Sequence, residues 1–462
     1  MISHEFHPTI LRAYDIRGIF EDTLTLADAR AIGIAFANCL VQRGYGNKVA
    51  VGRDGRLSSP ALANALIDGL IDGGASVFNI GCGPTPMLYF ANLFLETDGA
   101  IQVTGSHNPP THNGFKMVMN GASFFGDDIQ ALGADSRSGV AQRPNGNVSV
   151  VSIFDDYVTR ITRDADVGDV SVIWDCGNGA SGPATAAMVN HISGQHEVMF
   201  ADIDGTFPNH HPNPVDPETL NILRAAVAKN SADLGIGFDG DGDRIGIIDA
   251  KGRQVPGDIL TAFLAQDVAT RHPGKPIILD VKSSDIAMNE IAASGADSQI
   301  WKTGHSHMKK RMKDIDSPMA GEMSGHIFIA DQYYGFDDAL YVAMRVITHM
   351  HQSGQSITDY MDRLPVQHAT PELRIDCDDD VKFSVMERLA NHIVIEEGKE
   401  ATSLIDGVRV RKQDGWWLVR ASNTEAALVA RAEAKDAKML QQLVTEIETA
   451  LAVAGLNWTM PK

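Results

Sequence analysis

Residues 48–81 have the sequence KVAVGRDGRLSSPALANALIDGLIDGGASVFNIG, in which an apolar segment, a polar turn, a helical pattern and a second apolar segment follow one another. The helix is predicted by apolar residues with the spacing of one helix face, namely Leu62, Leu66, Ile67 and Leu70. The same order of segments returns at residues 170–202 and 275–304. Because the Val- and Ile-rich runs are too continuous for burial on one side, we expect mixed or parallel sheets with helices on both faces. The sequence therefore predicts three related α/β domains.

The C-terminal part of the chain follows a different pattern. After about Gln367, strand-like segments such as ELRIDC and WWLVRAS precede an amphipathic helix, which is typical of an α+β domain. The segment at residues 136–150 is the clearest linker, and the helix expected before it looks short and broken by SRSG. We therefore expect α/β domains at residues 1–149, 150–251 and 252–366, and an α+β domain at residues 367–462.

Length, charge and cysteine content limit the function classes. The 462 residues exceed what one hydrophobic core usually organises. The 39 Lys and Arg against 59 Asp and Glu give a net charge of −20, which disfavours nucleic acids and anionic membranes as partners. We find no run of the ~18 apolar residues that a spanning helix needs, and no targeting signal. The four cysteines, Cys39, Cys82, Cys176 and Cys377, lack metal-site or disulfide spacing, so a reducing cytoplasm is expected.

The acidic segment GFDGDGDRIGIID, residues 237–249, predicts a metal site. Asp239, Asp241 and Asp243 alternate with glycines, so three carboxylates can converge on one hard cation, for which Mg²⁺ is the natural choice. A calcium EF-hand loop is excluded, because it requires glycine and glutamate where this chain has Arg244 and Ala250. An acidic surface hairpin is the remaining structural alternative.

Two glycine-rich segments allow a different class of enzyme. GIGFDG at residues 235–240 precedes another strand-like run, so it lacks the helix of a dinucleotide-binding motif. GNGASG at residues 177–182 follows an apolar strand, opens a helix and has Asp202 near the next strand end. A Rossmann dehydrogenase is therefore an alternative to be tested, although a simple strand-to-helix connection explains the same glycines.

The segment VTGSHNPPTHNGFK, residues 103–116, presents Ser106 and His107 in a loop with two prolines. Such a loop predicts a stiff, exposed turn. A serine hydroxyl held there can form a phosphoester. His107 is equally well interpreted as an ordinary turn residue.

Two later segments carry groups that suit sugars and phosphates. In AGEMSGHIF, Glu322, Ser324 and His326 alternate, so an extended backbone points all three side chains to one side, where they can bind adjacent hydroxyls. In VRASNTEAALV, a guanidinium, two hydroxyls and an amide match the needs of a phosphate monoester. These groups belong to Arg420, Ser422, Asn423 and Thr424. Taken singly, the first segment is also compatible with a polar turn and the second with a helix cap.

Six motifs in this order resemble the α-D-phosphohexomutase superfamily, specifically its bacterial phosphomannomutase/phosphoglucomutase branch. They are RAYDIRG at 12–18, TGSHNPP at 104–110, DGDGDR at 239–244, KTGHS at 302–306, GEMSGH at 321–326 and RASNTE at 420–425. The resemblance spans the whole chain. It implies three α/β domains with mixed sheets covered by helices, plus a C-terminal α+β domain, around a central cleft into which each domain sends one loop.

The resemblance also implies roles for the site residues. In similar proteins the serine at Ser106 carries a phosphoryl group, and Mg²⁺ is bound by Asp239, Asp241, Asp243 and a phosphoserine oxygen. Arg244 and Lys116 can compensate further charge on the transferred group. The base that takes the proton of the sugar hydroxyl is expected in a cluster that leaves the choice open, namely Arg17, Lys116, His107 and His326. Positions that line the cleft in similar proteins are matched by Tyr14, Lys282 and His305.

The implied reaction has two phosphoryl transfers. Phosphoserine gives its group to a hexose phosphate, the resulting 1,6-bisphosphate turns around, and the other phosphate returns to Ser106. Glucose 1,6-bisphosphate is the expected activator, and phosphosugars are the expected small-molecule partners. Glu322 and Ser324 are expected to bind O3 and O4 in either orientation, while the loop from Arg420 to Thr424 binds the distal phosphate. Because mannose and glucose differ only at C2, we expect activity on both.

The sequence leaves three related alternatives. A metal-dependent phosphatase has no need for the second phosphate-binding loop, and a silent phosphosugar-binding protein could lose Ser106. A phosphoglucosamine mutase is expected to carry a different residue at Met323.

The chain departs from many relatives at Ala426, where they have proline, so its phosphate loop is less rigidly preset.

Overall fold

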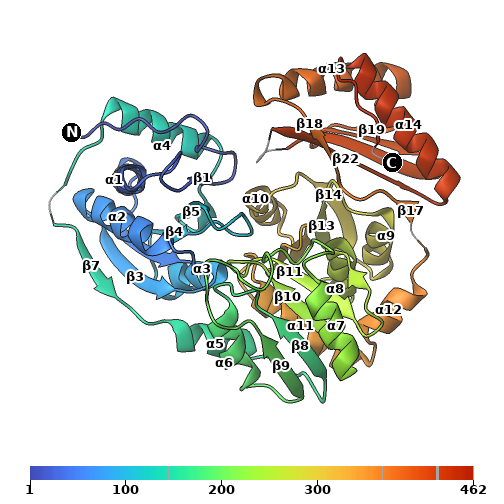
Figure 1. The fold of residues 1–462 in the computed structure, drawn as a ribbon, viewed down its shortest axis with the longest axis horizontal. Helices are drawn as coiled ribbons and strands as arrows, with labels where there is room; N and C mark the ends of the chain where they lie inside the picture. Colours follow the sequence, from blue (N-terminus) through green and yellow to red (C-terminus); the bar gives the residue numbers. More distant parts are fainter. Residues whose placement is uncertain (144, 367, 423–425, 461–462) are drawn as a thin grey trace.

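The computed structural model describes residues 1–143, 145–366, 368–422 and 426–460. Within these ranges the chain forms four sheets, one after another along the sequence, with helices against them (Figure 1). The first three sheets combine parallel and antiparallel pairs, whereas the paired strands of the fourth are antiparallel. The predicted fold class, three α/β units followed by an α+β unit, is confirmed.

The first sheet is buried on both faces. Val49 and Val51 of its central strand contact one layer of helices, and Ala50 between them contacts the other. The strands, in order across the sheet, are β1 (Ile16–Ile19), β5 (His112–Met119), β4 (Gly99–Val103), β2 (Lys48–Arg53), β3 (Ser76–Cys82) and β7 (Asn147–Val150), with β6 (Ala122–Ser123) beside β5. The helices are α1 (Leu26–Gln42), α2 (Ser59–Asp72) and α4 (Asp127–Ser138) on one face and α3 (Thr85–Phe94) on the other.

The second and third sheets each contain one of the repeated β-α-β units. In both, as in the first sheet, the two strands that flank the predicted helix pair in parallel, so all three units are confirmed. The second sheet has the order β12 (Gln254–Val255), β11 (Ile245–Asp249), β10 (Leu234–Phe238), β8 (Ser171–Asp175), β9 (Gln195–Met199), with helices α5 (Phe154–Thr162), α6 (Gly182–Val189) and α7 (Asn221–Asn230). The third has the order β14 (Asp297–Trp301), β13 (Pro276–Asp280), β15 (Met319–Gly321), β16 (Ile327–Ile329), with α8 (Gly257–Arg271), α9 (Asp285–Ala293), α10 (His305–Ile315), α11 (Ala339–Ser353) and α12 (Ile357–Arg363).

The fourth sheet has its own core. Its strands, in order, are β17 (His368–Ala369), β22 (Ala427–Ala434), β21 (Gly415–Ala421), β20 (Val408–Lys412) and β19 (Thr402–Ser403), with β18 (Leu373–Asp376) also on β22. Helices α13 (Asp379–Glu397) and α14 (Ala437–Val453) lie along one side of this sheet (Figure 1). Trp417, Leu389 and Leu443 meet between the sheet and these helices.

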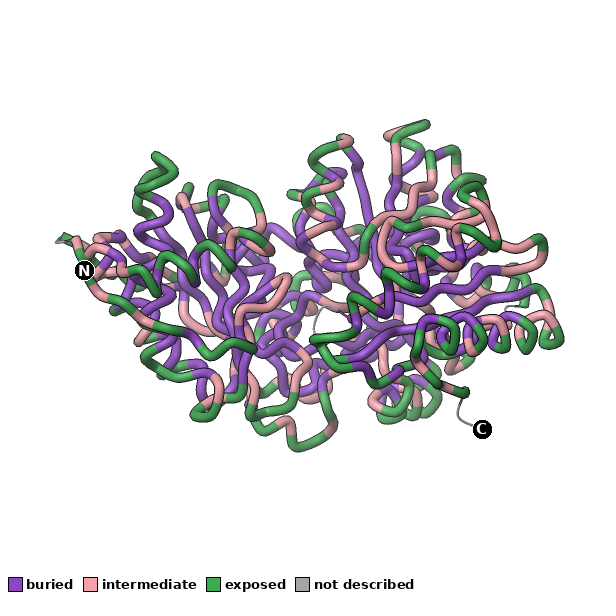
Figure 2. Tube along the Cα trace, turned by 90° about the horizontal axis from the view of Figure 1, so that it is seen from above, coloured by how far each residue is buried: buried purple, intermediate pink, exposed green. Residues whose placement is uncertain are grey.

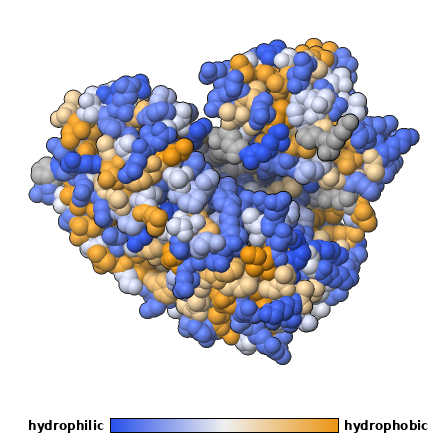
Figure 3. Space-filling model, in the orientation of Figure 1, coloured by the Kyte–Doolittle hydropathy of each residue, from blue (hydrophilic) through white to orange (hydrophobic). Residues whose placement is uncertain are grey.

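Burial divides the molecule into a large continuous body and a smaller attached unit. One apolar cluster extends from α3 through the second sheet to α8 and α11, so the first three sheets share buried contacts. Figure 2 shows the buried segments running through the interior, with exposed residues on the helices and connections at the outside. In Figure 3 the surface is hollowed between the lobe of the first sheet and that of the fourth, and hydrophilic side chains border the hollow. This hollow is the central cleft that was expected.

Three further expectations have an outcome in the fold. The helix before the linker is continuous, because α4 runs through SRSG to Ser138 and ends only at Gly139, whose φ is +99°. The prediction that this helix is short and broken was wrong. Residues 177–182, the glycine segment of the Rossmann alternative, are all buried, and Ala180 N donates to Gly240 O of the acidic loop at 2.9 Å. A buried connection leaves no surface for a pyrophosphate, so these glycines join a strand to a helix.

Across the described residues, no helix is long and apolar enough to cross a membrane.

Candidate active site

Ser106 lies in the turn that follows β4, and its hydroxyl points at the acidic loop. Its Oγ donates to Asp239 Oδ2 at 2.9 Å and lies 3.1 Å from His107 Nδ1. The backbone of Ser106 is left-handed, with φ +49°, and its N–H donates to Thr104 Oγ1 at 2.8 Å. Ser106 is only 1% exposed, so the expectation that the turn presents Ser106 in an exposed position was wrong, although Pro109, Pro110 and Thr111 of the same loop are exposed. The reason is close packing of the acidic loop, since a Cβ on Gly240 would lie 2.4 Å from Ser106 O.

The three aspartates lie in the connection between β10 and β11 and are fully buried. One carboxylate oxygen from each of Asp239, Asp241 and Asp243 lies within 4.8 Å of the others. Lys116, from β5, donates to Asp241 Oδ2 at 2.7 Å and also bonds to Asp243. Among the residues that the structure describes, Oδ1 of Asp241 and Oδ1 of Asp243 have no hydrogen-bond partner. Unpartnered buried carboxylate oxygens at such spacing are suited to a hard cation.

The charges of this cluster depend on one another. Burial, followed by the charges of Asp241 and Asp243, raises the pKa of Asp239 well above its usual value. Burial alone would also raise the pKa of Asp241, but Lys116 outweighs it and holds that pKa well below the ordinary range. Burial would lower the pKa of Lys116, yet the aspartates raise it above its usual value. Lys116 therefore stays protonated and partly neutralises the carboxylates.

Arg17 contacts the Ser106 turn, and His107 is part of it. Arg17 Nη1 donates to Asn108 Oδ1 at 2.7 Å, and its Nη2 pairs with Asp15 Oδ2 at 2.5 Å. Burial, followed by the charges of Arg244, Arg17 and Lys116, lowers the pKa of His107 well below its usual value. His107 is therefore a neutral imidazole in a cationic surrounding. The structure brings the predicted cluster of candidate bases together around Ser106.

His326 has a defined orientation. Arg244 Nε lies 3.1 Å from His326 Nε2, and Asp337 Oδ2 lies 3.1 Å from its Nδ1. Because Arg Nε–H can only donate, Nε2 must accept, which assigns the ring proton to Nδ1, facing Asp337. A protonated Nδ1 has no lone pair for a cation, so the neighbouring group of Asp243, His326 and Asp337 does not suit a second metal ion. Asp337 also accepts from Lys309 Nζ at 2.8 Å.

Glu322 connects the sugar-recognition segment to the start of α10. Its Oε1 accepts from Gly304 N, and its Oε2 accepts from Ser324 Oγ at 3.1 Å. Burial raises the pKa of Glu322. Tyr14 OH donates to Thr303 O at 2.8 Å, and its ring meets the ring of His305 edge-on. His305 in turn stacks on His326 with ring centres 5.6 Å apart. The predicted sugar-binding residues thus form one connected cluster.

The predicted phosphate-binding residue Arg420 and the predicted cleft residue Lys282 lie where the third and fourth units meet. Arg420 Nε pairs with Asp406 Oδ2 at 2.9 Å, and the same oxygen accepts from Thr303 N at 3.0 Å. Lys282 Nζ pairs with Glu372 Oε2 at 2.8 Å, and Arg420 is near enough to influence its pKa. Ser422 O accepts from Lys382 Nζ at 2.7 Å. Asn423 and Thr424 lie outside the described residues.

The order and content of the four units match known protein families. Four domain families of phosphoglucomutase/phosphomannomutase match the chain in consecutive order. They are alpha/beta/alpha domain I at residues 8–139, domain II at 155–252, domain III at 256–368 and the C-terminal domain at 372–450. The chain belongs to the phosphoglucomutase/phosphomannomutase family. A phosphomannomutase/phosphoglucomutase from Pseudomonas putida is 42% identical over 444 residues, which are 96% of this chain and 95% of that protein.

Two further family members carry related names. A phosphoglucomutase from Neisseria gonorrhoeae is 39% identical over 438 residues, which cover 94% of this chain and 95% of that protein. The crystal structure of a phosphoglucomutase/phosphomannomutase family protein from Burkholderia thailandensis has 37% identity and a TM-score of 0.91, with both chains covered in full. Family members of nearly equal similarity thus have names that differ in whether mannose is included.

Sequence reasoning missed several residues that this family member places around the site. Asp54 and Arg56, in the turn after β2, lie directly against the Ser106 turn. Asp337 contacts His326 and accepts from Lys309, and Asp406 holds Arg420. The signal for the first pair was the charged sequence RDGR within a short connection, which was interpreted only as a polar turn.

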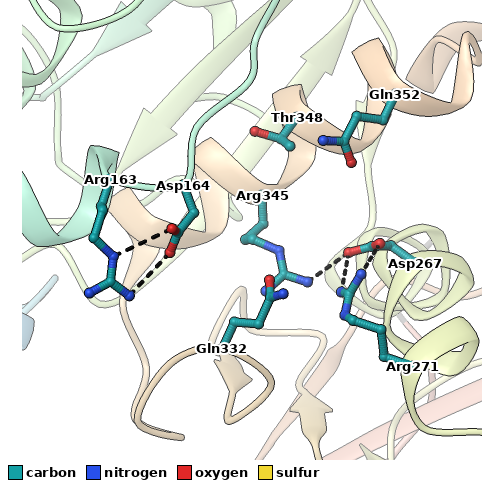
Figure 4. Close-up of a pocket in the computed structure, with 8 residues that line it drawn as sticks. All are labelled: Arg163, Asp164, Asp267, Arg271, Gln332, Arg345, Thr348 and Gln352. Carbon is teal, nitrogen blue, oxygen red and sulfur yellow. Dashed lines mark hydrogen bonds and ion pairs between the residues drawn. The ribbon is translucent and has the colours of Figure 1, made fainter.

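A separate cavity of about 480 Å³ lies between the end of α5 and helices α8 and α11 (Figure 4). It is lined by Arg163, Asp164, Asp267, Arg271, Gln332, Arg345, Thr348 and Gln352. Its arginines are neutralised by neighbours, since Arg345 and Arg271 both bond to Asp267 and Arg163 bonds to Asp164. Each of these guanidiniums is in an ion pair, and none of the lining residues is a predicted site residue of this family member.

Proposed function

We propose that this chain interconverts hexose 1-phosphates and hexose 6-phosphates of mannose and glucose, with Ser106 as the carrier of the phosphoryl group. The observation that carries the proposal is the 2.9 Å contact between Ser106 Oγ and Asp239 in the buried three-carboxylate cluster. Full-length relatives named phosphomannomutase/phosphoglucomutase support the reaction class.

The chain's own groups support two transfers through Ser106. In the first, the bond from Ser106 Oγ to phosphorus breaks as the free sugar hydroxyl forms its own bond to phosphorus. The hydroxyl proton passes to a base at the site. In the second, Ser106 Oγ takes the other phosphoryl group from the reoriented 1,6-bisphosphate and the sugar oxygen regains a proton. Arg17, Lys116 and Arg244 surround Ser106 with positive charge, which favours the anionic group being moved.

The carboxylate cluster fits Mg²⁺, because two buried oxygens of Asp241 and Asp243 have no hydrogen-bond partner within the described part of the chain. Asp239, Asp241, Asp243 and Ser106 would hold the ion. When bound, it would compensate charge on the phosphoryl oxygens. Glucose 1,6-bisphosphate would act as activator, because a first turnover requires a phosphorylated Ser106.

We assign the proton acceptor to His326. Its Nδ1 faces Asp337, so its basic atom is Nε2, which Arg244 must release before the ring can take the proton. Asp337, whose Oδ2 lies 3.1 Å from Nδ1, is in turn held by Lys309 at 2.8 Å. His107, the other imidazole beside Ser106, is kept neutral but has no carboxylate partner of this kind among the hydrogen bonds and ion pairs of the described residues.

The residues that bind the substrate must accept the sugar in both of its orientations. Lys282 and Arg420 would bind the idle phosphate, since both are buried cations where the third and fourth units meet. Glu322 and Ser324 would bind O3 and O4, whose places exchange when the sugar turns. None of these groups is assigned to C2, the carbon at which mannose and glucose differ, so both sugars are substrates.

The test is the intact mass of the protein before and after incubation with glucose 1,6-bisphosphate and Mg²⁺. The parent should gain one phosphoryl group, and Ser106→Ala should gain none and should lose mutase activity with both sugars. Inorganic phosphate released in proportion to substrate consumed would instead identify a phosphatase. A parent that never gains the group would contradict the carrier role.

A further inference from the structure

A single buried arginine holds the backbone of the Ser106 turn. Arg56 is 1% exposed, and the two terminal nitrogens of its guanidinium point into the turn. Nη2 donates to Ser106 O at 2.7 Å and to Asn108 O at 2.6 Å. Nη1 donates to Pro109 O at 2.6 Å and to His112 O at 3.0 Å. All four terminal N–H groups are therefore used on carbonyls of the turn and of His112, the first residue of β5.

Arg56 is itself held from three sides. Asp54 Oδ2 lies 3.2 Å from Arg56 Nε and also accepts from Gly105 N at 3.1 Å, so one carboxylate joins the arginine to the turn. A Cβ on Gly105 would lie 2.4 Å from Arg56 Nε, which shows how closely the turn lies on the guanidinium. The ring of Phe207, from the second unit, lies under the guanidinium at 5.2 Å.

The turn needs such support because its conformation is unfavourable by itself. Ser106 has a left-handed backbone, which costs a non-glycine residue on the order of 1 kcal/mol or more. Four carbonyl oxygens directed at one region also repel each other unless a donor lies among them. A guanidinium is planar, always charged and carries its donors in a fixed fork, so it sets the spacing of the four oxygens.

We propose that Arg56 is a positioning residue for phosphoryl transfer, which keeps Ser106 Oγ in one place through both transfers. The inference rests on the proposed function, because only a phosphoryl carrier needs its oxygen held in line with phosphorus twice in each cycle. Arg56 does not touch the reacting oxygen. It acts through the carbonyl of Ser106 and the three carbonyls that follow it, in the turn and at the start of β5.

The test compares Arg56→Lys with Arg345→Lys. Lysine keeps the charge but offers three tetrahedral donors from one atom, so at least one carbonyl loses its partner. Arg345 is a matched control, because it is also buried and bonds to Asp267, Asp331 and Tyr341, but it lies at the separate cavity (Figure 4). Mutase kcat and KM, the single-turnover rate of Ser106 phosphorylation by glucose 1,6-bisphosphate, and the unfolding temperature are measured for each.

We expect Arg56→Lys to lower kcat and the phosphorylation rate together by at least about tenfold, with KM changed less than about threefold. Arg345→Lys should lower the unfolding temperature and leave kcat unchanged. Equal kcat for Arg56→Lys and the parent would overturn the proposal, as would activity losses in both variants that merely follow the folded fraction.

A second variant keeps the inference testable if Arg56→Lys does not fold. Gly105→Ala retains the arginine but places a methyl group against its Nε, so the guanidinium must shift away from the turn. The same loss of kcat with little change in KM supports the proposal, and an unchanged kcat contradicts it. A parent that takes no phosphoryl group contradicts the proposed function itself, whereas a parent phosphorylated no faster than Arg56→Lys contradicts only the role of Arg56.

Discussion

Lys116 is the residue whose replacement most directly tests the metal site. It donates to Asp241 and Asp243, so Lys116→Met leaves the buried carboxylates without that positive charge. We expect the unfolding temperature in EDTA to fall, because breaking a buried ion pair costs about 3–5 kcal/mol. We also expect Mg²⁺ to raise that temperature more in the variant than in the parent, because the cation then supplies the missing charge.

Lys282→Met is the control for this measurement, since Lys282 is an equally buried lysine paired with Glu372, away from the aspartates. Its response to Mg²⁺ should equal that of the parent. An equal response in Lys116→Met would mean that the carboxylates do not bind the ion.

Single residues were predictable where the signal is local. Asp239, Asp241 and Asp243 lie in one short loop, so their spacing alone predicts that they converge. The contact of Lys116 with Asp241 joins residues 125 positions apart, and that of Ser106 with Asp239 joins residues 133 apart. Only the order of the strands brings these residues together, which is why resemblance to a family, and not spacing, pointed to them. Neither local spacing nor a family motif pointed to Arg56, because its acceptors are backbone carbonyls, which any sequence provides.

Among the elements, α11 begins at the carboxylate of Asp338, and burial disfavours the charged form of this carboxylate. Asp338 caps the helix by accepting from Tyr341 N at 3.0 Å, and it also accepts from Tyr157 OH and Tyr333 OH. Burial outweighs these bonds and raises the pKa of Asp338 to about 6. In an unfolded chain the pKa of aspartate is about 4.

The sign of the resulting pH dependence follows from these two pKa values. The folded protein holds the proton more tightly, so the protonated form stabilises the fold below about pH 4, and this stability is lost as pH rises from about 4 to 6. The loss is about 3 kcal/mol and stays constant above that range. Asp338→Asn keeps an acceptor for Tyr341 N and has no charge to bury. We expect its unfolding temperature, relative to the parent, to increase between pH 4 and pH 6.5, and a difference that is independent of pH would contradict the assignment.

Elements were predictable where the apolar period was strong. The helix of the first β-α-β unit buries Leu62, Leu66 and Leu70 at the expected spacing. In α4 the buried face consists of Ile129, Leu132, Gly133 and Ser136, and two small residues give a weak period. Those small residues permit close packing, since a Cβ on Gly133 would lie 2.4 Å from Leu11. Tertiary contact therefore maintains a helix that local sequence disfavours.

At the scale of the whole molecule, the fourth unit is attached to the third around Trp416. This side chain is fully buried, contacts Val281 and Leu418, and has the guanidinium of Arg409 3.8 Å from its ring. Arg409 donates onward to Val281 O at 3.1 Å. The next residue, Trp417, points to the opposite face of β21, into the core of the fourth unit itself. Adjacent tryptophans thus serve the interface and the internal core separately.

This division predicts different effects for two neighbouring substitutions. Trp416→Ala removes about 3–5 kcal/mol of packing from the interface, so the fourth unit should be held less firmly over the cleft. We expect KM for hexose 1-phosphate to rise at least about tenfold, together with faster protease cleavage between α12 and β18, while the Mg²⁺-dependent rise in unfolding temperature is retained. Trp417→Ala should lower the unfolding temperature of the fourth unit but leave KM near the parent value at temperatures where that unit is folded. Equal KM values in the two variants would show that Arg420 reaches the substrate without help from this interface.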